Sequence, residues 1–195
     1  MANESDDKIE IDEFAQTTDY STPAQKSVKE ILEADNNDES LKKYKEQLLG
    51  NNTQSIPAEV DPNNPLNVIL KRLAIIVDSK EMRSVDLPAS NEYTLAIKEG
   101  CIYKIQLEFY VQREIITGLK YLHKVSRLGV GIDKEKYMLG SYGPKESAYV
   151  YLSPPEEAPS GMLSRGKYKI RSLVADDDGN RYLEWSWYIE IEKDW

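Results

Sequence analysis

Residues 182–191 contain the feature that most constrains the fold of this chain, a regular alternation of apolar side chains with other side chains. Because side chains alternate across a β-strand, this pattern predicts a strand with one buried face. The side chains expected to point inward are Leu183, Trp185, Trp187, Ile189 and Ile191, and those expected to point outward are Tyr182, Glu184, Ser186, Tyr188 and Glu190. Two interpretations stay open: the tryptophans fill the core of a sandwich, or they line a cavity for an apolar ligand.

Residues 102–112 show the same period, with an apolar or aromatic side chain at every second position from Tyr103 to Val111. Other runs of strand type follow one another between Gly, Pro and Asp turns, without an intervening helix. The strands expected are 67–77, 93–97, 102–112, 115–125, 137–139, 148–152, 168–174 and 182–191. About eight short strands predict an all-β fold, an immunoglobulin-like antiparallel β-sandwich over residues 62–195.

The N-terminal part of the chain has a different pattern. Residues 1–19 carry seven carboxylates and one lysine, a net charge of −6 out of −9 for the whole chain, and we expect residues 1–22 to be disordered. Residues 23–50 are expected to form a helix-loop-helix, with Pro23 in its first turn, Asp38 as an N-cap and Gly50 as the end. Helices this short are marginal in water, so this flexible arm needs a docking surface on the chain or on a partner. Residues 51–61 are expected to be a linker.

Catalytic and metal-binding chemistry is not indicated by the composition. His123 is the one histidine and Cys101 the one cysteine, so no metal cluster, Cys-His pair or cofactor is expected, and the chain is predicted not to be an enzyme. The acidic balance disfavours binding to nucleic acid. No apolar run approaches the roughly 20 residues that span a bilayer, and we expect a soluble, cytosolic protein. Asp176, Asp177 and Asp178 do not fit a calcium loop and are expected to be solvated, or presented to a basic group, in a turn between strands.

Several short motifs, in order along the chain, resemble the Rho GDP-dissociation inhibitor family. They lie at residues 23–27, 38–41, 43–45, 113–115, 118–121, 140–144, 156–159, 161–163, 165–166 and 176–178. The resemblance covers about residues 20–195. It implies a sandwich that holds the geranylgeranyl group of a prenylated Rho- or Rac-type GTPase between its sheets, and an arm that contacts the GTPase switch regions. The complex would keep GDP bound and would extract the GTPase into the cytosol after a transient membrane encounter.

The resemblance also implies roles for particular residues. The GTPase switch contacts would be Asp38, Ser40, Leu41, Tyr44 and Asp178, and the contacts to a basic GTPase tail would be Glu156 and Glu157. The prenyl pocket would involve Leu95, Tyr103, Leu107, Tyr137, Ile170, Trp185 and Trp187. Leu95 stands where an aromatic residue is expected in the family. Lys167 stands where some members carry a phosphorylatable serine, while Ser27 is a candidate phosphorylation site.

Two other functions would also be compatible with a β-sandwich. A general prenyl or acyl carrier would share the fold but lack specificity for Rho-type GTPases. A structural or carbohydrate-binding sandwich would expose its tryptophans to solvent, and it would account for neither the amphipathic arm nor the acidic N-terminus.

Overall fold

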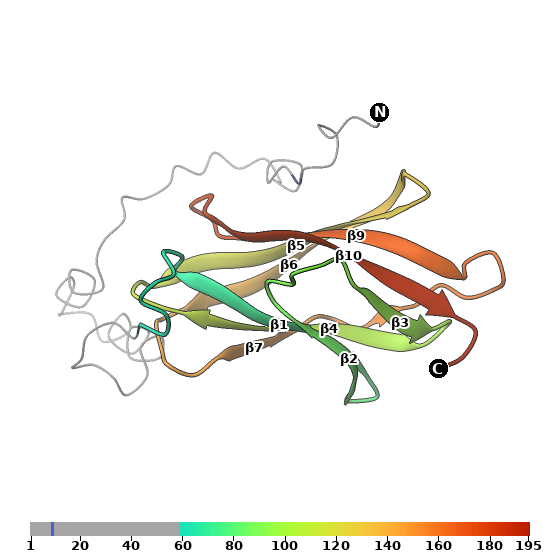
Figure 1. Ribbon diagram of the computed structural model, residues 1–195, viewed down its shortest axis with the longest axis horizontal. Coiled ribbons are helices and arrows are strands. Elements are labelled where there is room, and N and C mark those ends of the chain that lie inside the picture. Colours follow the sequence, from blue (N-terminus) through green and yellow to red (C-terminus); the bar gives the residue numbers. More distant parts are fainter. Residues whose placement is uncertain (1–8, 10–58) are drawn as a thin grey trace.

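Ten β-strands form two five-stranded sheets that face each other in the computed structural model, which describes Ile9 and residues 59–195 (Figure 1). The first sheet has the order β2-β1-β4-β7, and β8 also pairs with β4. Its strands are β1 (Val68–Val77), β2 (Lys80–Asp86), β4 (Ile102–Val111), β7 (Tyr149–Leu152) and β8 (Glu156–Glu157). The second sheet has the order β3-β10-β9-β5-β6. Its strands are β3 (Thr94–Lys98), β5 (Ile116–Arg127), β6 (Val130–Tyr142), β9 (Gly166–Ala175) and β10 (Arg181–Glu192).

This arrangement confirms the predicted all-β sandwich, with differences at the edges. β2 and β8 were not predicted, and β6 begins at Val130 instead of 137. All seven residues of β6 from Val130 to Lys136 are exposed, so this edge strand lacks the one-sided apolar pattern that a buried face produces. The sheet is also not wholly antiparallel, because β3 pairs with β10 in parallel, with Leu95 opposite Ile189.

The inward face of β10 is the one that alternation predicts, and Trp187 is fully buried in the core. Tyr182 is an exception: it was expected to point outward but is buried. The register of β10 against β9 shifts between Arg181 and Leu183, and this bulge turns Tyr182 toward the interior. Its hydroxyl donates a hydrogen bond to the carboxylate of Asp176.

The turn at residues 176–180 is present, but the expectation that its carboxylates are solvated or presented to a basic group is wrong for Asp176. Asp176 is buried and accepts hydrogen bonds from the backbone N–H and the side-chain amide of Asn180, each at 2.9 Å. A buried carboxylate requires such partners, because leaving water without them is costly. Asp176 therefore shapes the turn, while Asp177 is exposed and Asp178 half-buried.

The predictions for residues 1–22 and 23–50, and for most of 51–61, fall outside the described residues. No helix within Ile9 and residues 59–195 is long and apolar enough to cross a membrane.

Truncating Trp187 should destabilise the fold strongly. Trp187→Ala removes a fully buried indole and its hydrogen bond to Ser172, and we expect a loss of about 3–5 kcal/mol in the free energy of unfolding. Trp195→Ala is the control: this residue is 50% exposed, and its removal should change stability by no more than about 0.5 kcal/mol. Urea unfolding followed by circular dichroism measures both. Equal stability of the two variants would contradict the placement of Trp187 in the core.

Candidate functional site

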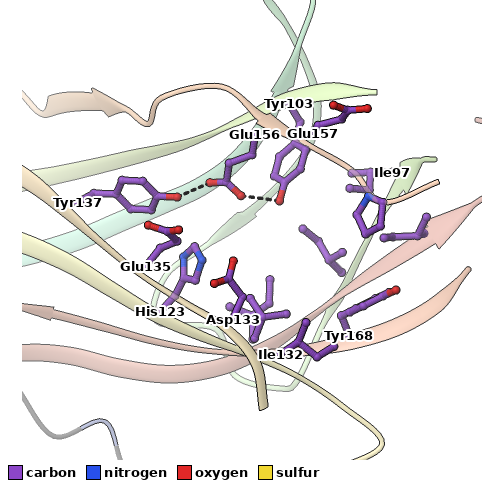
Figure 2. Close-up of a pocket in the computed structure, with 15 residues that line it drawn as sticks. Ile97, Tyr103, His123, Ile132, Asp133, Glu135, Tyr137, Glu156, Glu157 and Tyr168 are labelled. Atoms are coloured by element: carbon purple, nitrogen blue, oxygen red, sulfur yellow. Dashed lines mark hydrogen bonds between the residues drawn. The ribbon is translucent and has the colours of Figure 1, made fainter. Parts of the chain in front are cut away.

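A cavity of about 370 Å³ opens between the inner face of the second sheet and strands β4 and β8 (Figure 2). Asp133 and Glu135 of β6 pair with Val125 and His123 of β5, so all four side chains lie on the inner face. Asp133 and Glu135 are nevertheless exposed, which shows that the first sheet does not cover this end of the inner face. The short β8, with two residues, is the part of the first sheet that stands opposite.

The lining of the cavity combines an apolar interior with an acidic rim. The apolar members are Ile97, Val125, Ile132, Ile170, Ile189 and Ile191, and Pro159 and Tyr168 complete this part. The polar members are Tyr103, His123, Asp133, Glu135, Tyr137, Glu156 and Glu157. Four carboxylates beside an apolar interior suit a ligand with a hydrocarbon body and a cationic end.

Glu156 connects the two sheets at the mouth of the cavity. Its carboxylate accepts a hydrogen bond from Tyr103 of β4 at 2.7 Å and another from Tyr137 of β6 at 2.6 Å, as Figure 2 shows. Burial raises the pKa of Tyr103 and Tyr137, and the nearby Glu156 carboxylate raises both further. Both phenols therefore stay protonated and act as donors.

Aromatic rings form a layer behind the cavity. Tyr121 stacks with Tyr137 and with Trp185, at 6.0 Å between ring centroids in each case. The Tyr121 hydroxyl and the Trp187 indole N–H both meet the Ser172 hydroxyl, at 2.8 and 2.9 Å. Since the polar ends of these rings are satisfied inside the protein, they can be buried at no cost in lost hydrogen bonds.

His123 lies in the cavity lining with 2% of its surface exposed. Its Nδ1 atom is buried and has no hydrogen-bond partner among the described residues. Burial lowers the pKa of His123, while the carboxylates of Glu156 and Asp133 act in the opposite direction. The imidazole is therefore held neutral in the folded protein at neutral pH.

The turn at residues 176–180 carries a second group of carboxylates. Asp177 pairs with Lys120, with 3.2 Å between Oδ1 and Nζ. Burial raises the pKa of Asp178, and the charges of Asp176 and Asp177 raise it further. Gly118 allows the close approach of this turn: it has φ +61°, and a Cβ there would lie 1.8 Å from the Asp177 carboxylate.

Comparison with known proteins identifies the family to which such a sandwich belongs. The family described as RHO protein GDP dissociation inhibitor matches residues 4–194. The chain belongs to the Rho GDP-dissociation inhibitor family. A probable rho GDP-dissociation inhibitor of Caenorhabditis elegans is 48% identical over 180 residues, which cover 90% of this chain and 92% of that protein. Rho GDP-dissociation inhibitor 1 of Homo sapiens is 44% identical over 191 residues, covering 95% and 91%. Rho GDP-dissociation inhibitor 3 of Homo sapiens is 41% identical over 182 residues, covering 91% and 79%.

These similarities confirm the family that the sequence motifs suggested. The family consists of non-enzymatic regulators, and membership confirms the prediction that this chain is not an enzyme. The fully buried Trp187 and half-buried Trp185 also disagree with a carbohydrate-binding sandwich that exposes its tryptophans.

The structure brings together some of the residues predicted for the site of this Rho GDP-dissociation inhibitor family member. Tyr103, Tyr137, Ile170, Glu156 and Glu157 all line the cavity. The other predicted pocket residues, Leu95, Leu107, Trp185 and Trp187, belong to the core or pack against it without lining the cavity. Asp178 lies in the turn at 176–180, and Asp38, Ser40, Leu41, Tyr44 and Ser27 lie outside the described residues. The functional roles of all these residues stay predictions.

Several lining residues were missed from the sequence. Tyr168, Ile189 and Ile191 were placed in strands but not in the site, and Ile132, Asp133 and Glu135 lie in a part of β6 that was not predicted. The alternation of β5 provided one available signal, because His123 lies two residues after Tyr121 and two before Val125, on one face of the strand.

Protonation of His123 should make the stability depend on pH. Because burial lowers its pKa in the folded state, the unfolded chain binds the proton first as the pH falls below about 6.5, and stability decreases from there. We expect the wild type to lose stability relative to His123→Gln between about pH 7 and 5, with a slope of at most about 1.4 kcal/mol per pH unit. Urea unfolding of both proteins across this range measures the difference. A constant difference at all pH values would show that His123 titrates alike in both states.

Proposed function

We propose that this chain inhibits GDP release from prenylated Rho- and Rac-type GTPases and carries them in the cytosol, with the geranylgeranyl group held in the cavity between the sheets. The observation that carries this proposal is the cavity itself, an apolar interior bounded by carboxylates in a member of the Rho GDP-dissociation inhibitor family. The interior suits a hydrocarbon chain. The rim suits the basic segment that precedes a prenylated cysteine.

Transfer of the lipid alone does not account for extraction from a membrane. Burying a methylene contributes about 0.8 kcal/mol in a bilayer, and burial in an apolar cavity contributes a similar amount, so the two nearly cancel. Extraction therefore depends on other contacts. A basic residue near an anionic membrane gains about 1 kcal/mol, and Asp133, Glu135 and Glu157 offer a replacement for that anionic surface.

The second set of contacts is proposed for the GTPase switch regions. Asp38, Ser40, Leu41 and Tyr44 of the arm and Asp178 of the turn would hold the switches in the GDP-bound state. In the free protein, Asp178 is half-buried and its pKa is raised by burial and by Asp176 and Asp177. A cationic group of a partner would offset the repulsion between the carboxylate of Asp178 and those of Asp176 and Asp177, which favours Asp178 as a contact.

A charge placed in the cavity lining should weaken extraction. Ile132 is 55% exposed and lines the cavity, so Ile132→Asp should leave the fold intact while a carboxylate faces the lipid. We expect extraction of a geranylgeranylated Rho protein from liposomes to weaken about tenfold, since removing a charge from water costs at least the corresponding 1.4 kcal/mol or so.

Val130→Asp is the matched control for this experiment. Val130 lies on the same strand and is 67% exposed, but it does not line the cavity. The control adds the same charge and should extract within about twofold of wild type, which corresponds to about 0.4 kcal/mol. If both variants extract equally poorly, the effect comes from net charge and the assignment of the cavity is wrong.

The switch contacts are tested by the release of labelled GDP from the purified complex. Asp178→Ala and Asp38→Ala should each accelerate release about tenfold, the effect of losing about 1.4 kcal/mol of charge-assisted contact. Asp86→Ala, at an exposed position of β2 in the other sheet, should leave the rate unchanged. Release at the wild-type rate from the Asp38→Ala complex would show that Asp38 does not contact the switch regions and acts at most as a helix cap. The same result for Asp178→Ala would show that the turn at residues 176–180 is not part of the interface.

A further inference from the structure

The outer face of the second sheet carries a small apolar cluster formed by Leu122, Leu173 and Ala175. Leu122 of β5 pairs with Leu173 of β9, and both side chains point away from the inner face that holds Tyr121 and Ser172. Apolar side chains on the outside of a sandwich are normally open to solvent. These three are instead fully buried, so another part of the molecule covers them.

Among the residues that the structure describes, Ile9 covers this cluster. It has 0% exposure and forms one apolar group with Leu122, Leu173 and Ala175. In Figure 1 it is the short blue segment beside the sheet that contains β5, β9 and β10. More than 110 residues separate Ile9 from any of the three in the sequence, so this is a tertiary contact.

The backbone of Ile9 is held as well as its side chain. The Ile9 N–H donates to Glu184 Oε1 at 3.3 Å, and Arg181 Nη1 donates to the Ile9 carbonyl at 3.0 Å. Glu184 is itself fixed, because it accepts a hydrogen bond from Arg171 Nε at 2.9 Å. Burial acts to raise the pKa of Glu184, but hydrogen bonds from Arg181, Arg171 and the Ile9 amide lower it overall. Glu184 is thus a charged acceptor, which strengthens these bonds.

The charge of the outer face complements that of the N-terminal stretch. In the strand register, Lys124 of β5 lies opposite Lys134 of β6 and Arg171 of β9. Lys136 of β6 lies opposite Leu122, and Lys169 of β9 lies opposite Ser126, so this face carries basic residues from β5, β6 and β9. Residues 1–19, which include Ile9, have a net charge of −6. A residue two positions from Ile9 can lie at most about 7 Å along the chain from it, and the Debye length at physiological salt is about 8 Å. The carboxylates next to Ile9 in the sequence are therefore close enough to this face for salt not to screen their attraction to its basic residues.

We propose that the outer face of the sheet β3-β10-β9-β5-β6 is a docking site for the acidic N-terminal stretch of the same chain, with Ile9 as its apolar anchor. The cluster of Leu122, Leu173 and Ala175 selects an aliphatic side chain. Arg181 and Glu184 form hydrogen bonds with the backbone of the segment at Ile9, and the basic residues around them attract its carboxylates.

A consequence concerns the segment that contains the proposed arm. The far end of that segment is also fixed: Gln112 Oε1 accepts hydrogen bonds from the N–H groups of Val60 and Asp61 at 3.1 and 3.0 Å, and Arg113 pairs with Glu59 at 2.8 Å. Docking of Ile9 therefore fixes the chain at Ile9 as well as at Glu59, the two described residues on either side of the proposed arm. Closing a loop lowers the conformational entropy that a partner must overcome to order it. This consequence rests on the proposed function, whereas the docking itself does not.

The docking is tested in the full-length protein without any GTPase. A nitroxide is attached at Ser5→Cys in a Cys101→Ser background, and the methyl signals of Leu122 and Leu173 are recorded by NMR. We expect strong broadening of these signals by the label. Ile9→Asp should reduce the docking equilibrium at least about tenfold and restore the signals, because the apolar burial is lost. The added carboxylate would itself be attracted to the basic face, so a loss of the broadening reports on the loss of the apolar anchor and not on charge.

Two controls accompany this variant. Phe14→Asp adds the same charge to the same acidic stretch and should leave the broadening unchanged, and Ile9→Val keeps an aliphatic anchor and should retain most of it. Unchanged broadening in Ile9→Asp would overturn the proposal. Mixing nitroxide-labelled protein with isotope-labelled, nitroxide-free protein tests the source of the segment. Broadening between different molecules would assign the docked segment to a second copy and overturn docking within one chain.

Discussion

The geometry of the cavity depends on the carboxylate of Glu156. It accepts one hydroxyl donor from each sheet, Tyr103 from β4 and Tyr137 from β6, at the edge where the first sheet narrows to β8. Hydrogen bonds to a charged acceptor are stronger than neutral ones, so this single group fixes the spacing of the sheets at the mouth. Glu156 is thereby engaged within the protein. Glu157, which is exposed, and the rim carboxylates of β6 are better placed to meet a basic partner.

The aromatic layer behind the cavity explains why the space does not collapse. Tyr121 lies between Tyr137 and Trp185, and Ser172 meets the polar ends of Tyr121 and Trp187. The Trp185 indole N–H donates a hydrogen bond to the Tyr93 hydroxyl at 3.0 Å, and the Tyr93 ring stacks on Trp187. Rings that are stacked and hydrogen-bonded lose little by staying in place, and closing the cavity would break these contacts. Of the two interpretations of the β10 tryptophans, the structure therefore supports the first: Trp187 belongs to the core and Trp185 packs against it, and neither lines the cavity.

The sequence predicted half-buried strands better than exposed ones. The faces of β4 and β10 follow from alternation, because strands inside a sheet bury one side. The N-terminal half of β6 was missed because an edge strand exposed on both sides has no such pattern, and it carries Ile132, Asp133 and Glu135 of the lining. Tyr182 and Asp176 were misplaced because a bulge is not visible in periodicity. Ile9 was not singled out, since Ile9, Ile11 and Phe14 are too few apolar residues among the carboxylates to predict a docked segment.

The alternation of β5 and β6 also separates opposite charges across one sheet. The pair of His123 and Glu135 faces the cavity, while the neighbouring pair of Lys124 and Lys134 faces outward, so the acidic rim and the basic outer face lie on opposite sides of the same strands. The net charge of −9 conceals this arrangement. If the acidic N-terminal stretch covers the basic face, it removes the attraction of that face to an anionic membrane without competing for the rim. At the mouth of the cavity, a basic GTPase tail would then meet the carboxylates that belong to its lining. Both of these proposed effects would favour departure from the membrane, and they would act through different surfaces of one sheet.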